Sequence, residues 1–230
     1  FLLLGGDMAF RHLQYGLAVF CFIGAVLSTF LVYGIARKLP GVHTAVILAG
    51  IAISTICGAI IAWLHLFSDA ESMRNLTFWL MGSLHQADWP ILSIATPLAV
   101  VFCVYLLRQG QALNLFYFGS TDAKLAGVDV NQFSKRILVV SALLVGLAVS
   151  VAGSIAFVGL LVPHFLRNLF GFDNRVILPA SALCGGCLLM LVAIVSDRVA
   201  GIAIPVSMLT ASIGGPLFLY SIIKLSRRVN

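Results

Sequence analysis

Long apolar runs with very few charged residues follow one another along the whole chain. Most are close to the ~20 residues that a helix needs to cross a bilayer. They are continuous and do not alternate with polar residues, which indicates helices and not the strands of a barrel. We expect an all-α integral membrane protein, a polytopic helical bundle with about seven membrane segments at Tyr15–Ala36, Thr44–Phe67, Trp89–Leu107, Ile137–Ala152, Ile155–Phe170, Val176–Val195 and Ile204–Ile223.

The composition supports the same class. Hydrophobic residues make up 61% of the chain and charged residues only 10%, whereas soluble domains carry roughly a quarter charged residues. A net charge of +6 would suggest a nucleic-acid partner in a soluble protein. In a membrane protein the bias of Lys and Arg toward cytoplasmic loops accounts for it, so the lipid bilayer is the expected partner and nucleic acid is not.

The distribution of basic residues predicts the orientation. If every segment crosses and the loop after Ala36 is cytoplasmic, the connections alternate sides. Only three of the fourteen Lys and Arg then lie outside, namely Arg11, Arg74 and Arg198, and the other eleven lie inside. This asymmetry places the C-terminus in the cytoplasm.

The stretch Ala112–Arg136 is amphipathic and interrupts the apolar runs. Asp122, Lys124 and Asp129 together are incompatible with a membrane span, and glycines such as Gly127 are typical breaks between short helices. We interpret the stretch as two short helices at the inner membrane surface that form a socket for another protein. An ordinary loop packed on the chain's own spans would show the same spacing.

Small residues recur every fourth position on two of the predicted spans. Such stripes allow close helix packing in lipid, where water exclusion does not drive association. They are candidates for helix packing or for a translocation path: Gly50, Ser54, Gly58 and Ala62 on the second span, Gly146 and Ser150 on the fourth.

No catalytic constellation is present in the sequence. It has no GxxxxGK[ST] phosphate loop, HExxH or GxSxG, so this chain is not expected to be an enzyme or to hydrolyse ATP itself. The five cysteines lie inside apolar runs and the five histidines are scattered, so no metal site and no bound cofactor are expected. No acidic residue lies deep in a span, which disfavours a carrier driven by an ion gradient.

Four stretches resemble the FecCD/BtuC-like family, the permease subunits of type II ABC importers for ferric siderophores, haem and cobalamin. In chain order they are Phe78–Trp89, Ala112–Val130, Ala152–Leu183 (AGSIAFVGLLVPHFLRNLFGFDNRVILPASAL) and Ile204–Lys224. The resemblance implies a ten-span subunit, of which residues 1–230 would be one permease domain covering spans four to ten. The chain, which begins at Phe1 within an apolar run, would then start partway through a longer protein.

The resemblance also implies partners and site residues. The partners would be a pair of ATP-binding subunits with ATP–Mg, a second permease subunit (a copy or a close paralogue) and a periplasmic substrate-binding protein, at a bacterial inner membrane. Arg198 would dock the binding protein, although Ala203-Ile204-Pro205 replaces the family's Glu-Leu-Pro nearby. Residues 112–136 would be the coupling segment, with the ATPase contacts at Asn114, Gly119, Asp122, Ala123, Lys124, Leu125, Ala126 and Gly127.

The expected mechanism is alternating access, in which ATP binding by the partner moves Asn114–Val130 and tilts the spans. The predicted path faces are small and apolar without a ring of charge, which suits a bulky chelate. General similarity of the external segment makes ferric siderophore the leading substrate. Haem or cobalamin is the alternative within the same class. A secondary transporter driven by an ion gradient is the remote alternative.

Overall fold

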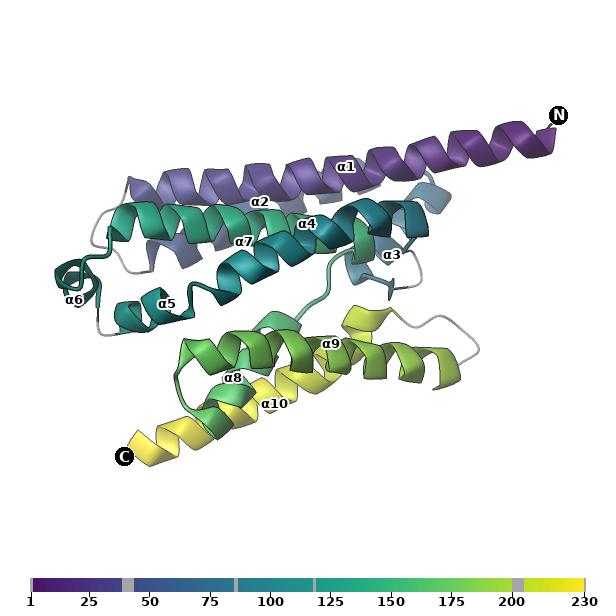
Figure 1. The fold of residues 1–230 in the computed structure, drawn as a ribbon. Helices are drawn as coiled ribbons and strands as arrows, with labels where there is room; N and C mark the ends of the chain where they lie inside the picture. Colours follow the sequence, from purple (N-terminus) through teal and green to yellow (C-terminus); the bar gives the residue numbers. More distant parts are fainter. Residues whose placement is uncertain (1, 39–43, 85–86, 118, 200–204, 230) are drawn as a thin grey trace. The chain divides into compact units, whose positions relative to one another are not determined.

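The fold is built of helices throughout the described residues (Figure 1). The computed structural model describes residues 2–38, 44–84, 87–117, 119–199 and 205–229. Within these ranges the chain forms ten α-helices: α1 Leu2–Arg37, α2 Ala45–Leu66, α3 Ala70–Met81, α4 Trp89–Leu107, α5 Gly110–Tyr117, α6 Ser120–Leu125, α7 Val130–Ala152, α8 Val158–Phe170, α9 Asn174–Val199 and α10 Val206–Val229. The predicted all-α fold is confirmed.

Five of the described helices are long and apolar enough to cross a membrane. The qualifying stretches lie in α1, α2, α4, α7 and α9, and α8 and the first part of α10 are shorter apolar helices. Large apolar side chains on these helices stay exposed, as at Trp63 (65%) and Leu183 (72%). Apolar exposure on this scale suits a lipid environment, and the chain is a membrane protein.

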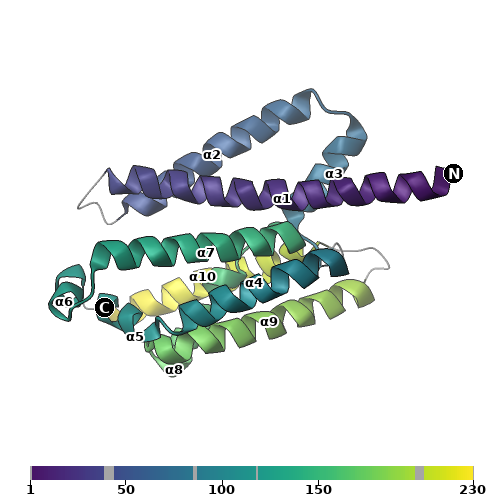
Figure 2. The ribbon, with the colours of Figure 1, turned by 45° about the horizontal axis from the view of Figure 1, so that its top comes forward.

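The chain divides into two compact units. The first comprises residues 1–77, 88–102 and 131–151. Within it α1 contacts α2, and α7 runs beside α1 (Figure 2). Gly146 on α7 marks the close approach, because a Cβ atom there would lie 3.0 Å from a ring carbon of Phe22 and 3.4 Å from the Cβ of Ala25. Small residues therefore bring these two helices together.

The second unit comprises residues 78–87, 103–130 and 152–230. Its core lies between α8 and α9, where Val162, Leu166 and Ile177 are buried against one another. Val162 and Leu166 are four residues apart and so share one face of α8. α10 packs on both of these helices, and α5 contacts α9.

A non-helical stretch, residues 153–157, joins α7 to α8 in the second unit. Side chains of α10 bond to part of its backbone: the Ser207 hydroxyl donates to the Ser154 carbonyl (2.6 Å) and accepts from the Ala156 amide (3.2 Å), and the Thr210 hydroxyl donates to the Ala156 carbonyl (3.0 Å). Phe157 ends the stretch in the left-handed region, at φ 68°. Membrane proteins tolerate non-helical backbone where it is buried in protein and hydrogen-bonded.

The predicted first span, Tyr15–Ala36, agrees with the apolar stretch Ala18–Arg37, which lies within the longer helix α1. Two predicted boundaries are wrong. α7 begins at Val130 and not at Ile137, so the end of the amphipathic stretch 112–136 belongs to that helix. α8 begins at Val158 and not at Ile155, because the preceding backbone bonds to α10.

Candidate functional site

α6 is a single short helix bounded by two glycines with positive φ. Gly119 (φ 113°) precedes it and Gly127 (φ 86°) follows it. At its end the Val128 amide donates to the Ala123 carbonyl and the Gly127 amide to the Lys124 carbonyl, both at 3.0 Å. This is the Schellman arrangement, which favours glycine at the left-handed position. The preceding helix α5, Gly110–Tyr117, is also short, so the prediction of two short helices with glycine breaks is confirmed.

One side of α6 is buried and the rest is exposed. Ala123 has no exposed surface, whereas Leu125 is 83% exposed. Most of the other predicted contact residues are also exposed: Asp122, Lys124, Ala126 and Gly127. We call residues 121–127, without Ala123, the α6 surface. Leu125 is the large apolar side chain of this surface, and its neighbours there are polar or small.

α5 is held against the beginning of α9. Gly110 is buried there, and a Cβ atom on it would lie 3.1 Å from the Cα of Arg175. One turn later the Asn114 amide nitrogen donates to the Asp173 carboxylate, with 2.6 Å between Nδ2 and Oδ1. The Asn114 side-chain oxygen accepts from the Asn174 backbone amide at 2.7 Å. Asn114 thus uses both its donor and its acceptor within the chain.

Asp173 is the N-cap residue of α9. Its carboxylate accepts from the Arg175 backbone amide at 2.9 Å, the bond expected between an N-cap side chain and the second helical residue. The Asn114 hydrogen bond, followed by that of the Arg175 amide, lowers the pKa of the Asp173 carboxyl from its ordinary value of 3.8. Asn114 and Asp173 together satisfy two of the four amides that a helix start leaves without intrahelical partners.

The end of α8 joins the same cluster. The Arg167 guanidinium donates to the Asn174 side-chain oxygen at 2.8 Å, and its Cζ lies 5.9 Å from the ring centroid of Phe172. The Tyr117 ring, at the end of α5, lies 5.5 Å from the same ring. Hydrogen bonds and ring contacts therefore connect α5, α8 and the start of α9; we call this set the α5–α9 clamp: Asn114, Tyr117, Arg167, Phe172, Asp173 and Asn174.

The predicted ATPase-contact residues divide into two groups. Asn114 and Ala123 face the chain itself, whereas Asp122, Lys124, Leu125, Ala126 and Gly127 lie on the α6 surface and Gly119 precedes it. Arg198 lies in the last turn of α9, and its side chain, like residues 203–204, is outside the described part of the structure. The coupling and docking roles stay predictions.

Sequence reasoning missed Asp173 and Asn174. The available signal was the capping pattern, an Asp directly before a long apolar helix. That pattern predicts the start of α9, but it does not reveal that a helix sixty residues earlier in the chain supplies a second cap through Asn114.

The two small-residue stripes differ in environment. Gly146 packs against α1, and Ser150 is buried with its hydroxyl bonded to the Leu147 carbonyl at 2.8 Å. A Cβ atom on Gly50 or Gly58 would meet nothing within 4 Å, and Ser54 and Ala62 are exposed. The α7 stripe is therefore a packing surface within the unit, while the α2 stripe is open.

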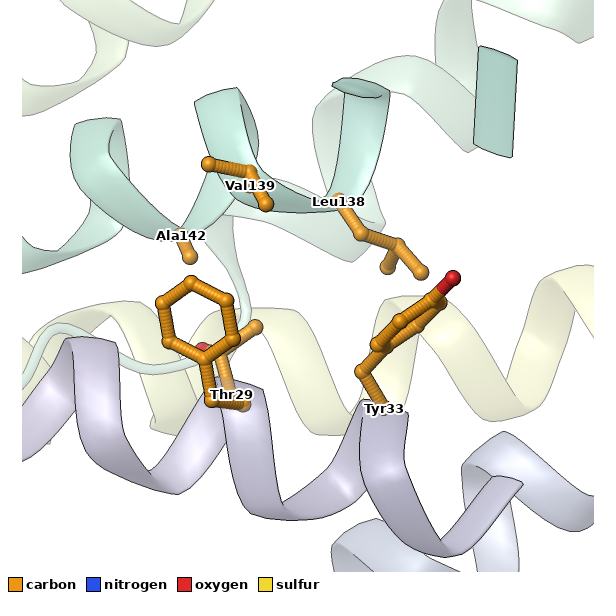
Figure 3. Close-up of a pocket in the computed structure, with 6 residues that line it drawn as sticks. Thr29, Tyr33, Leu138, Val139 and Ala142 are labelled. Atoms are coloured by element: carbon orange, nitrogen blue, oxygen red, sulfur yellow. The ribbon is translucent and has the colours of Figure 1, made fainter. Parts of the chain in front are cut away.

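The first unit holds a small apolar hollow between α1 and α7 (Figure 3). Thr29 and Tyr33 face Leu138, Val139 and Ala142 across it, and its volume is about 10 Å³. A cavity needs about 10–15 Å³ of this kind to hold one water molecule, so this hollow is too small for a ligand. Among the described residues no three His, Cys, Asp or Glu side chains gather as metal ligands.

Comparison with known protein families identifies the chain. Residues 1–224 match the FecCD transport family. The chain belongs to the FecCD transport family. This match covers nearly all of the sequence, and the resemblance inferred from the four stretches is confirmed.

Other FecCD proteins are similar over most of the chain. The hemin transport system permease protein HmuU of Yersinia pestis is 40% identical over 211 residues, 91% of this chain and 63% of that protein. The vitamin B12 import system permease protein BtuC of Vibrio cholerae is 37% identical, covering 88% and 61%. The cobalamin import system permease protein BtuC of Halobacterium salinarum is 41% identical, covering 86% and 54%. The chain therefore spans less than two thirds of the length of each relative.

A solved structure is also similar to this chain in fold. It is described as a metal-chelate type ABC transporter in an inward-facing conformation. The TM-score is 0.80 at 30% sequence identity, and the match covers 92% of this chain and 72% of the other. The helical arrangement of this chain is thus that of an ABC transporter permease.

Proposed function

We propose that the chain is the membrane-spanning permease part of an ATP-driven importer, working by alternating access. The α6 surface is the observation on which this proposal depends. It presents the exposed Leu125 among polar side chains, while Ala123 anchors the helix to the chain. A surface that is fixed to the body yet open outward can receive a push from an ATP-binding subunit.

The partners follow from the same proposal. A pair of ATP-binding subunits docks on the α6 surface and hydrolyses ATP–Mg, a reaction for which this chain has no phosphate-loop motif. A second permease subunit completes the translocation path, and a periplasmic binding protein delivers the substrate. The protein lies in the bacterial inner membrane, with the α6 surface and the C-terminus in the cytoplasm.

The substrate class that we propose is a bulky metal chelate. Ferric siderophore is the candidate from the sequence. Haem and cobalamin are equally strong candidates, because similar permeases are named for hemin transport and for vitamin B12 import. All three are bulky and hold a metal ion but differ in size, charge and shape, so a transport assay can separate them.

The test is uptake by proteoliposomes that contain the intact protein, its ATP-binding subunit and its binding protein. We expect uptake of one chelate among ferric siderophore, hemin and cobalamin, with ATP and not with ADP. Liposomes lacking the ATP-binding subunit are the control. Uptake that persists in that control, and that stops when the proton and sodium gradients are collapsed, would identify a secondary transporter and refute the proposal.

A further inference from the structure

The α5–α9 clamp lies between the exposed helix α6 and the buried cluster of α8 and α9. α6 is largely exposed, whereas the α8–α9 pair contains the buried cluster of Val162, Leu166 and Ile177. α5 lies between them in the chain of contacts, since it packs on both α6 and α9. Contacts through α5 therefore offer a direct route from the α6 surface to α9.

The connection between α5 and α9 depends on few groups. At Gly110 the two backbones approach closely enough that a Cβ atom would lie 3.1 Å from the Arg175 amide nitrogen. This contact can resist compression, but it offers no bond against separation. Asn114 supplies that bond in two directions, to the Asp173 carboxylate and from the Asn174 amide.

Both Asn114 hydrogen bonds reach the N-terminus of α9. The Asn174 amide belongs to the first helical residue and has no partner within α9. Asn174 itself is buried, and its side chain is held by Arg167 from α8. A pull on Asn114 thus acts on the N-terminus of α9 and, through Arg167, on the last turn of α8.

We propose that Asn114 is a positioning residue that couples α5 to the start of α9, so that movement of the α6 surface is transmitted to the α8–α9 pair. This inference rests on the proposed function, because it supposes a partner that moves α6. It differs from the sequence prediction, which gave Asn114 a direct contact with the ATPase. In the structure its side chain is already bonded within the chain and acts through α9.

The experiment exchanges the donor and the acceptor. Asn114→Asp sets a carboxylate against the Asp173 carboxylate, and like charges at this distance repel. In the double variant Asn114→Asp/Asp173→Asn the side-chain amide introduced at position 173 donates to the carboxylate introduced at position 114, which still accepts from the Asn174 backbone amide. The double variant therefore restores the link between α5 and α9 with the direction of one hydrogen bond reversed, while the Arg175 amide, which bonds to the same Asp173 oxygen as Asn114, loses that acceptor. Asn168→Asp, an exposed position on α8, is the control for added charge.

The first measurement needs no partner and no transport. In the intact permease alone we expect hydrogen exchange at the Asn174 amide to be faster by about fivefold or more in Asn114→Asp, because repulsion from the Asp173 carboxylate moves the acceptor at position 114 away from that amide and one net hydrogen bond is lost. The double variant and Asn168→Asp should exchange like the wild type. Unchanged exchange in Asn114→Asp would overturn the clamp, whatever the protein transports.

The second measurement is the number of substrate molecules taken up per ATP hydrolysed in proteoliposomes. We expect this ratio to fall about fivefold or more in Asn114→Asp, with ATP hydrolysis retained, and to recover in the double variant. Faster amide exchange with an unchanged ratio would show that the clamp only stabilises the fold, which overturns the transmission role. If the wild type itself shows no ATP-dependent uptake, the proposed function fails, a result distinct from either outcome for Asn114.

Discussion

Gly153 and Trp79 approach so closely that a Cβ atom on the glycine would lie 2.6 Å from the carbonyl oxygen of Trp79. Gly153 also has a positive φ of 68°. The site therefore excludes any other residue for two reasons, the missing space and the backbone conformation.

Gly153→Ala should destabilise the protein by more than about 2 kcal/mol, since the left-handed conformation alone costs an L-residue roughly 1–2 kcal/mol and the backbone must also shift. The midpoint of thermal unfolding in detergent measures this. Gly159→Ala is the matched control, because a Cβ atom there meets nothing within 4 Å and alanine is favoured in a helix by up to about 1 kcal/mol. Equal losses in the two variants would contradict the steric explanation.

The hydroxyl groups on α10 support the non-helical stretch before α8. Ser207→Ala removes the donor to the Ser154 carbonyl and the acceptor for the Ala156 amide. Thr210→Val removes only the donor to the Ala156 carbonyl from this stretch. An unsatisfied amide costs about 1–3 kcal/mol, and carbonyls are left under-satisfied more often than amides. We therefore expect Ser207→Ala to lower the unfolding midpoint more than Thr210→Val, and the reverse order would refute this assignment.

A charged substitution on the α6 surface should keep the fold and weaken the binding of the ATP-binding subunit. Leu125→Asp places a charge at the most exposed apolar side chain of the segment (83% exposed), so the unfolding midpoint should not change. Binding of the ATP-binding subunit should weaken by about tenfold or more, as for a central interface residue. Co-purification and titration with that subunit measure the effect, and Leu125→Met should bind like the wild type. Undiminished binding by Leu125→Asp would remove Leu125 from the interface.

Much of this fold follows from the sequence alone. The apolar run Trp89–Leu107 coincides with α4 because its length and flanking polar residues define a helix locally. Gly119 and Gly127 indicate the limits of α6, because both positions need a positive φ that glycine adopts without strain.

Other features depend on residues that are distant in the sequence. Ile155 lies in an apolar run that resembles any helix start, yet the backbone there is non-helical and is hydrogen-bonded to the Ser207 and Thr210 side chains. Asn114 lies in an amphipathic stretch that predicts an exposed polar face, yet its partner is 59 residues away. Periodicity and composition report local preference and carry no signal for such pairings.

The small residues of α7 and α2 look alike in the sequence and should respond differently to the same substitution. Gly146→Leu must displace Phe22 and Ala25, and overpacking of this kind costs about 1–3 kcal/mol, so the unfolding midpoint should fall. Gly50→Leu and Gly58→Leu enter open space and should leave the midpoint unchanged.

The open α2 stripe can be tested separately, through the dimeric fraction of the permease. Because small stripes allow close helix contacts in lipid, we expect Gly50→Leu to reduce the dimeric fraction of the intact permease, measured by cross-linking in membranes, whereas Gly146→Leu should leave that fraction of the folded protein unchanged. An unaltered dimeric fraction in both Gly50→Leu and Gly58→Leu would mean that the second subunit does not use the stripe. A loss of thermal stability in Gly50→Leu as large as in Gly146→Leu would instead place a packing partner against α2.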